Sequence, residues 1–118
     1  MDVVLESLLE KMHATEVDIN IHVKATFNVT PFVARQKVNV MLLDKVGTGL
    51  LAETPDLVAT DGHLRWRVPV VLALPGSGNL GQVGTVDVDV QSGEVLADDA
   101  LLKAITHHAI QLAPSSTL

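Results

Sequence analysis

The 118-residue sequence contains no cysteine. This absence excludes disulfide bonds, thiolate catalysis and metal or iron–sulfur centres held by cysteine. Aromatic residues are also scarce, because Phe27, Phe32 and Trp66 are the only three. Since 47% of the residues are hydrophobic, the core must be built mainly from Val, Leu, Ile and Ala. Clustered β-branched residues favour strands, so a strand-rich core is expected.

Positive charge is sparse as well. Eight Lys and Arg against fourteen Asp and Glu give a formal net charge of −6. Proteins that bind nucleic acid usually present a basic patch to the phosphates, whereas the basic residues here are spread thinly along the chain. The sequence therefore predicts that nucleic acid is not a partner.

Long apolar runs are absent too. The longest, Val68 to Leu74, is far shorter than the roughly 20 residues that a membrane-spanning helix needs. The stretch Met1 to Glu6 has no basic region, and Glu10 and Lys11 would interrupt the apolar part of a signal peptide. We therefore expect a cytoplasmic protein that does not act at a membrane.

The length and hydrophobicity predict one α+β domain over residues 1–118, with a flexible tail at 114–118. Asp2 is placed to cap a helix over about Asp2 to His13, where apolar residues recur at helical spacing. From Val17 to Phe27 apolar and polar residues alternate strictly, which predicts a strand with one buried face. A long strand of this kind is typical of a sheet edge or of pairing across a dimer.

A second helix is predicted to begin at Thr30 and Pro31, with threonine as the N-cap and proline in the first turn. Gly47 stands where a left-handed residue would end it. Thr48 to Pro55 is then expected to be a loop. The predicted packing side of this helix consists of Val33, Val38, Met41, Leu42 and Val46. The polar side consists of Arg35, Gln36, Asn39, Asp44 and Lys45.

From about Leu57 to Leu96 the pattern predicts an antiparallel β-meander, packed against the helices. Asp61 and Gly62 suit a type I′ turn ahead of a long strand, about His63 to Leu74. Within that strand Pro69 cannot donate to a ladder, so its position requires an edge or a bulge. Asp98 or Asp99 is expected to cap a C-terminal helix that follows the meander.

The strand from Gln82 to Val90 pairs naturally with the long strand before it. In a hairpin of matching parity, Trp66 and the even-numbered valines lie on the buried face. Arg65 and Arg67 then lie opposite Asp87 and Asp89 on the other face, as favourable cross-strand charge pairs.

Gly76 to Gly81 matches the dinucleotide-binding pattern GxGxxG. That mechanism requires a helix to open at the motif, so that its N-terminal amides hold a pyrophosphate. The residues that follow alternate as a strand instead. The glycines therefore predict a hairpin loop, and no dinucleotide or other cofactor is expected.

Histidines supply the remaining candidates for a site. His107 and His108 are adjacent on the predicted C-terminal helix and point about 100° apart, so they are not expected to share a metal ion. No catalytic constellation and no metal site is predicted. If a small ligand binds between sheet and helices, the polar groups to hold it are His22, His63, Arg65 and His108.

Two segments resemble PepSY-like domains, over about Pro31 to Leu96. The residues that carry the resemblance are Trp66-Arg67-Val68-Pro69-Val70 and Val86-Asp87-Val88-Asp89-Val90-Gln91-Ser92-Gly93-Glu94-Val95-Leu96, within which Val88 to Val95 follows the family pattern V-D-x-x-[ST]-G-E-V. The resemblance implies a helix packed on an antiparallel sheet, used as a non-enzymatic binding or regulatory module. It implies fold-defining roles for Trp66, Asp89 and Gly93, and no catalytic residue.

Two hypotheses of function remain open. The first is a small non-enzymatic binding or regulatory domain, acting through protein–protein contacts and forming a homodimer. The second is a small-ligand-binding protein or an enzyme with its pocket between the sheet and the helices.

Overall fold

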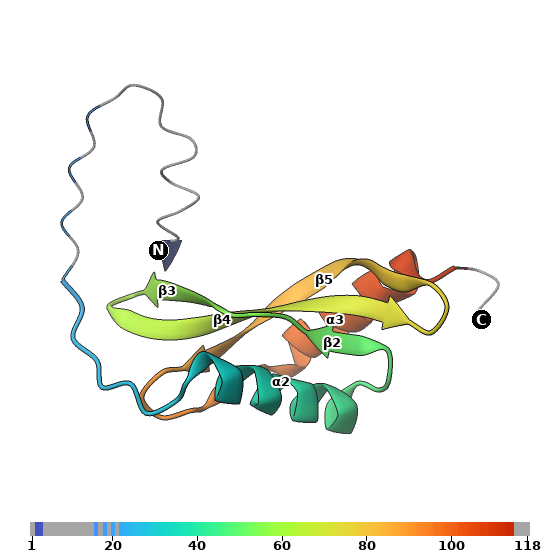
Figure 1. Cartoon of the computed structure of the whole chain (residues 1–118), viewed down its shortest axis with the longest axis horizontal. Helices are drawn as coiled ribbons and strands as arrows, with labels where there is room; N and C mark the ends of the chain where they lie inside the picture. The colour runs from blue at the N-terminus through green and yellow to red at the C-terminus, as the bar shows by residue number, and fades with distance from the viewer. Residues whose placement is uncertain (1, 4–15, 17, 19, 21, 115–118) are drawn as a thin grey trace.

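The computed structural model describes residues 2–3, 16, 18, 20 and 22–114 of the chain. Its strands form one antiparallel sheet, and both helices pack on the same face of that sheet (Figure 1). This arrangement confirms the predicted α+β fold with a central meander. The elements are β1 (Asp2–Val3), α2 (Pro31–Lys45), β2 (Leu50–Ala52), β3 (Asp56–Thr60), β4 (His63–Leu74), β5 (Gly78–Asp89), β6 (Val95–Leu96) and α3 (Asp99–Leu112).

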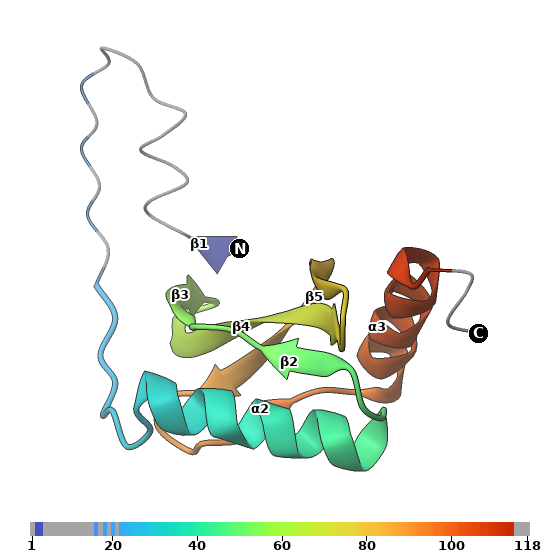
Figure 2. The same ribbon diagram turned by 45° about the vertical axis from the view of Figure 1, so that its right-hand side comes forward.

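The hydrophobic core fills the space between the sheet and the two helices. Figure 2 shows α2 running beneath the sheet and α3 standing to the side of it, next to β5. Each buried Val, Leu or Ile contributes about 1.5–3 kcal/mol through removal of apolar surface from water. The core residues are Val29, Ala34, Val38, Leu42, Ala52, Val68, Val70, Leu72, Val83, Val86, Val88 and Ile105.

β4 is the central strand, and one of its edges is shared by two partners. β3 pairs with the first half of β4 and β2 with the second, while β5 covers the opposite edge. Pro69 lies at the junction of β2 and β3, where its carbonyl accepts a hydrogen bond from the Glu53 amide at 2.8 Å. The nitrogen of a strand residue points the same way as its carbonyl, so the missing N–H of Pro69 faces this junction. The proline therefore breaks no ladder bond to β5.

Two bulges set the register of the β4–β5 hairpin. The pairing shifts by one residue between Val70 and Val71, and again between Leu72 and Ala73. Each shift reverses which side of the strand faces the core. As a result, the odd-numbered Val83 faces the same core as the even-numbered Val86 and Val88 of β5.

The predicted turns are confirmed by their backbone angles. Asp61 and Gly62 join β3 to β4 with φ values of 49° and 79°, as a type I′ turn requires. Gly76 and Gly78 lie in and beside the β4–β5 turn with φ values of 79° and 69°. The GxGxxG match is thus a hairpin loop that leads into a strand.

The predicted helix caps are also confirmed. The Thr30 hydroxyl accepts from the Val33 amide at 3.1 Å, and the Asp98 carboxylate accepts from the Leu101 amide at 2.8 Å. Gly47, with a positive φ of 142°, closes α2 by donating to the Leu42 carbonyl at 2.9 Å. Neither helix in the described part of the chain is long and apolar enough to cross a membrane.

The structure differs from the sequence prediction at the N-terminus. Asp2 and Val3 pair with β3 as β1, so they do not begin a helix. The remainder of the predicted helix, residues 4–13, lies outside the described residues.

The prediction of a strand over Val17 to Phe27 is wrong for the residues that are described, because 18, 20 and 22–27 belong to no strand. Alternating polarity makes a strand only where a neighbour supplies the hydrogen bonds. The chain bonds to the sheet region just beyond this segment. There the amides of Asn28 and Val29 donate to the carbonyl of Val90, the residue after β5, at 2.9 and 3.2 Å.

The stretch predicted as a loop, Thr48 to Pro55, contains the short strand β2. Two polar side chains of α2 bind it: Arg35 donates to the Ala52 carbonyl at 2.8 Å, and the Asn39 side-chain oxygen accepts from the Ala52 amide at 2.9 Å. Both residues were expected on the solvent side of the helix. A strand of three residues shows no period in the sequence, so contacts with α2 and β4 decide its structure.

Candidate functional site

The structure does not bring the four predicted ligand-binding residues together. His22 is exposed in the segment before α2, and His63 is exposed at the start of β4, two residues from Arg65. His108 lies on α3, where its Nδ1 is 2.9 Å from the carbonyl oxygen of Val83. Val83 is next to the residues paired with Val70 and Val71, about 20 Å along the strand from Arg65. The predicted set therefore forms no single site.

The predicted charge pairs are confirmed as cross-strand neighbours, but only one is an ion pair. Arg67 donates from Nε and Nη2 to the two carboxylate oxygens of Asp87, both at 2.9 Å. Arg65 lies opposite Asp89 in register, yet its Nε is buried without a hydrogen-bond partner. The two arginines on this face therefore differ in their surroundings.

Asp89 is bound by the turn that follows it. Its Oδ1 accepts from the amides of Gln91 and Ser92, both at 2.8 Å. The hydrogen bond from the Ser92 amide is the main reason why the pKa of Asp89 lies below its usual value. Burial raises the pKa, whereas the Gln91 amide, the Ser92 hydroxyl and the charge of His63 lower it further. The carboxylate thus acts as a cap for the turn.

Gly93 joins this same turn to α2. Its carbonyl accepts from Lys37 Nζ at 2.9 Å. A Cβ at Gly93 would lie 2.8 Å from Lys37 Nζ and 3.0 Å from a methyl group of Val29, and its φ of 75° also favours glycine. The turn from Asp89 to Glu94 is therefore a contact point between the sheet and α2.

Among the described residues there is no group of three or more His, Asp or Glu that could hold a metal ion. The rings of His107 and His108 have their centroids 6.1 Å apart and are tilted by 49°. His108 is turned towards β5, and His107 lines a separate depression.

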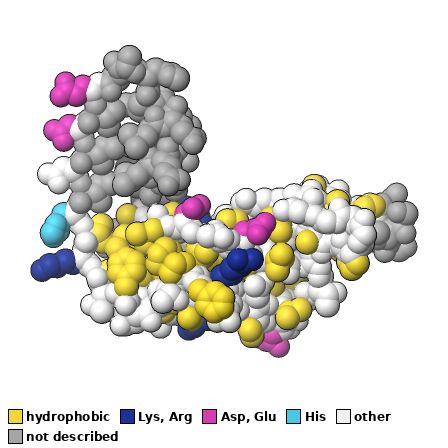
Figure 3. Space-filling view, in the orientation of Figure 1, with side chains coloured by type: hydrophobic (Ala, Val, Ile, Leu, Met, Phe, Trp, Pro, Cys, Tyr) yellow, Lys and Arg dark blue, Asp and Glu magenta, His cyan; other side chains and the backbone are white. Residues whose placement is uncertain are grey.

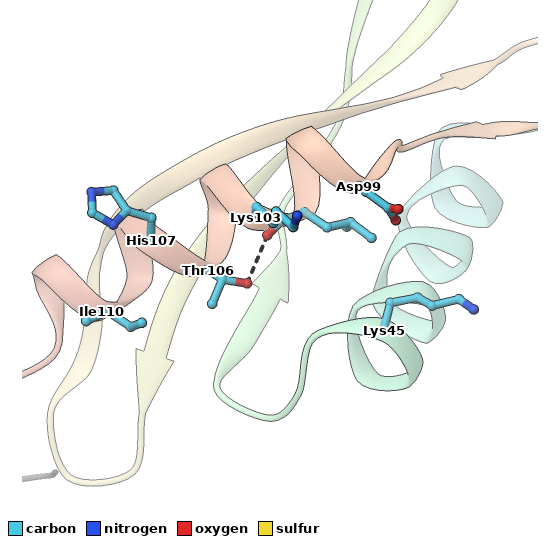
Figure 4. Close-up of a pocket in the computed structure, with 7 residues that line it drawn as sticks. Lys45, Asp99, Lys103, Thr106, His107 and Ile110 are labelled. Atoms are coloured by element: carbon cyan, nitrogen blue, oxygen red, sulfur yellow. Dashed lines mark hydrogen bonds between the residues drawn. The ribbon is translucent and has the colours of Figure 1, made fainter.

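That depression lies between the C-terminal end of α2 and the outer side of α3, and its volume is about 390 Å³ (Figure 4). Lys45 approaches from α2, and the other lining residues belong to α3. Thr106 uses its hydroxyl to donate to the Leu102 carbonyl at 2.9 Å, so it does not point a free donor into the space. The depression is lined by Lys45, Asp99, Leu102, Lys103, Thr106, His107 and Ile110.

The side of α2 that faces away from the sheet is unusually apolar. Phe32 and Val40 are each 67% exposed and Leu43 is 62% exposed. We call this side the outer α2 surface, and it consists of Phe32, Val33, Gln36, Lys37, Val40, Leu43 and Asp44. Together with Met41 and with Val95 of β6, five of these residues line a depression of about 710 Å³.

Val33 was predicted to pack inward but is 37% exposed and belongs to this outer surface. Ala34, Val38 and Leu42 face the core instead. α2 thus carries large apolar residues both towards the core and away from it, and an apolar side of a helix is expected to be covered. The excess of apolar residues in α2 is the sequence signal that could have identified the surface.

A second apolar group lies near the first residues of β3, around Trp66. Phe27 meets Trp66 edge to face, with ring centroids 5.9 Å apart, and the Trp66 Nε1 donates to the Val29 carbonyl at 2.7 Å. Leu57, opposite Trp66 in register, is 45% exposed. Figure 3 shows apolar side chains gathered over the left end of β3 and β4 and over α2.

Comparison with known proteins gives no relative: no family model, no curated protein and no solved structure matches this chain.

Proposed function

We propose that this chain is a small non-enzymatic binding or regulatory module, which acts through protein–protein contacts at the outer α2 surface and forms a homodimer. The observation that carries the proposal is the exposure of Phe32, Val40 and Leu43, each above 60%, on one side of a single helix. Large apolar side chains that gather on a surface are typical of interaction sites. The resemblance of the Asp89 to Glu94 turn to PepSY-like modules supports the same reading.

The depression beside Val40 strengthens the case. It is lined by apolar side chains of α2 and by Val95, and also by Gln36, Lys37 and Asp44. An apolar centre with charged residues around it is the usual anatomy of a protein interface. The proposed contact region is thus formed by two elements, which the Lys37–Gly93 hydrogen bond holds together.

A photo-crosslinking amino acid in place of Val40, in the full chain expressed in its native cells, tests this function. We expect adducts to one or a few defined proteins, this chain included, which mass spectrometry identifies. The matched control carries the same amino acid in place of Ile110, which is 57% exposed on α3. Equal labelling at both positions, or no adduct at position 40, would contradict the proposal.

A small-ligand-binding protein or enzyme is the alternative, and one observation favours it. Lys45 and Lys103 line the 390 Å³ depression between α2 and α3, together with Asp99 and His107, in a chain whose formal net charge is −6. Two lysines at one hollow favour an anionic metabolite.

A further inference from the structure

The outer α2 surface has the spacing of a coiled-coil seam. Val33, Gln36, Val40 and Leu43 follow one another at intervals of three, four and three residues. This is the a and d spacing of a heptad, which places all four side chains in one row along the helix. All four are exposed, and the seam from Val33 to Leu43 therefore covers about three turns of the helix.

Two opposite charges lie beside this row, on the same flank. Lys37 and Asp44 each follow a d residue, so both occupy e positions, seven residues or about 10.5 Å apart along the axis. Lys37 Nζ donates to the Gly93 carbonyl at 2.9 Å, which fixes the ammonium group and leaves two of its protons available. The Asp44 side chain is 70% exposed, with Lys45 Nζ 3.6 Å away.

We propose that the occupant of the outer α2 surface is a second copy of this chain, whose α2 packs antiparallel across a two-fold axis close to Val40. This inference rests on the proposed function and names its partner. In an antiparallel two-fold pair each flank of one helix meets the same flank of the other. Lys37 therefore lies against Asp44 of the partner subunit, and Asp44 against the partner's Lys37.

The charge pattern selects this arrangement over others. In a parallel pair the flank with Lys37 and Asp44 would meet the opposite flank of the partner helix, which carries Phe32 and Asn39 and no charge. An uncharged partner would likewise offer no opposite charge to Lys37 or to Asp44. A surface with one cation and one anion, equally far from its midpoint, is complementary to itself, as a two-fold interface requires.

The contact is small, since two helices of this length and Val95 make up most of it. Interfaces at the low end of the size range belong to weak, reversible complexes. The equilibrium should therefore depend on concentration, and it should be followed from about 1 to 300 µM by sedimentation velocity.

Charge reversal on the purified full chain tests the geometry. Asp44→Lys replaces the two attractive pairs between Lys37 and position 44 of the partner subunit with two repulsive ones. We expect it to weaken dimerisation about tenfold. Lys37→Glu should weaken it similarly. Mixed together, the two variants should associate with each other about as well as the wild type, because every cross-subunit pair is again attractive. Val40→Glu should be monomeric, and the control Ile110→Glu should behave as the wild type.

Thermal unfolding of each variant by circular dichroism separates loss of association from loss of fold. If Val40→Glu does not fold, Asp44→Lys still decides, since Asp44 is a surface residue and its replacement leaves the Lys37–Gly93 hydrogen bond in place. A monomer throughout the concentration range, or a dimer that the charge variants leave unchanged, would overturn this inference. In either case adducts at position 40 to a different protein would leave standing the proposed protein–protein contact at the outer α2 surface, without the homodimer.

Discussion

The side chain of Asp89 lies at its predicted position in the sheet, but its hydrogen-bond partners differ from the prediction. The sequence placed it opposite Arg65, and the register confirms this. Its carboxylate nevertheless binds the amides of Gln91 and Ser92 at 2.8 Å. Backbone donors two and three residues away are already in place, whereas a guanidinium must be ordered at an entropic cost. Arg67 and Asp87, by contrast, form the predicted cross-strand ion pair.

Asp89→Ala is expected to lower the free energy of unfolding by about 1–2 kcal/mol, because two turn amides lose their acceptor. Asp89→Asn keeps an acceptor oxygen and should cost less, so it is the matched control. Urea unfolding at neutral pH measures both. Equal losses for the two variants would show that the charge, and not the turn cap, is what matters.

The same carboxylate makes stability depend on pH. Since its pKa is lowered in the folded state, its contribution is complete above the unfolded value of about 3.9 and is lost as the pH falls through the folded value. The stability difference between the wild type and Asp89→Asn should therefore shrink in acid below about pH 4.

At the scale of elements, the sequence predicted α2, α3, the type I′ turn and the β4–β5 pairing correctly, because each has a cap, a glycine or a clear period. It failed for β2 and for the segment before α2. β2 depends on Arg35 and Asn39, side chains whose partners lie elsewhere in the chain. The outer α2 surface was missed because Val33 was assigned to the packing side, while Phe32, Val40 and Leu43 were assigned to neither side of the helix.

The packing of α3 on β5 depends on Gly84. A Cβ at this position would lie 2.9 Å from Cγ1 of Ile105, a fully buried residue. No positive φ is involved at Gly84, so close approach alone explains the glycine. α3 can lie against the strand because this residue has no side chain.

Gly84→Ala should therefore destabilise the fold by about 1–3 kcal/mol through overpacking. Ile105→Ala alone should cost about 2–5 kcal/mol by leaving a cavity. Together they should cost less than the sum, because the alanine methyl at 84 occupies part of that cavity. A double-mutant cycle in urea measures this coupling; strict additivity would mean that the two residues do not touch.

For the whole molecule, the sequence predicted the class and the meander but not where candidate site residues would meet. His63 and His108 are separated by most of the length of the β4–β5 hairpin, a distance that only the register reveals. The lysines of the depression between α2 and α3 come from helices more than fifty residues apart in the chain. Their meeting depends on how both helices pack on the sheet.

If the alternative function were correct, an anionic metabolite in the α2–α3 depression would raise the unfolding midpoint of the whole domain. A thermal-shift series with phosphate, carboxylate and nucleotide probes measures this, since a ligand at 100 times its Kd adds about 2.7 kcal/mol. On the proposed function we expect no shift with any probe. A shift that Lys103→Ala abolishes and that Ile110→Ala retains would favour the ligand-binding alternative.

Trp66 connects the segment before α2 to the centre of the sheet, through Phe27 and the Val29 carbonyl. The chain has one tryptophan and no tyrosine, so its ultraviolet emission comes from this position alone. Indole emission depends on the polarity around the ring and on the hydrogen bond that its N–H makes. The protein thus carries an intrinsic fluorescent probe at the point where its N-terminal segment docks.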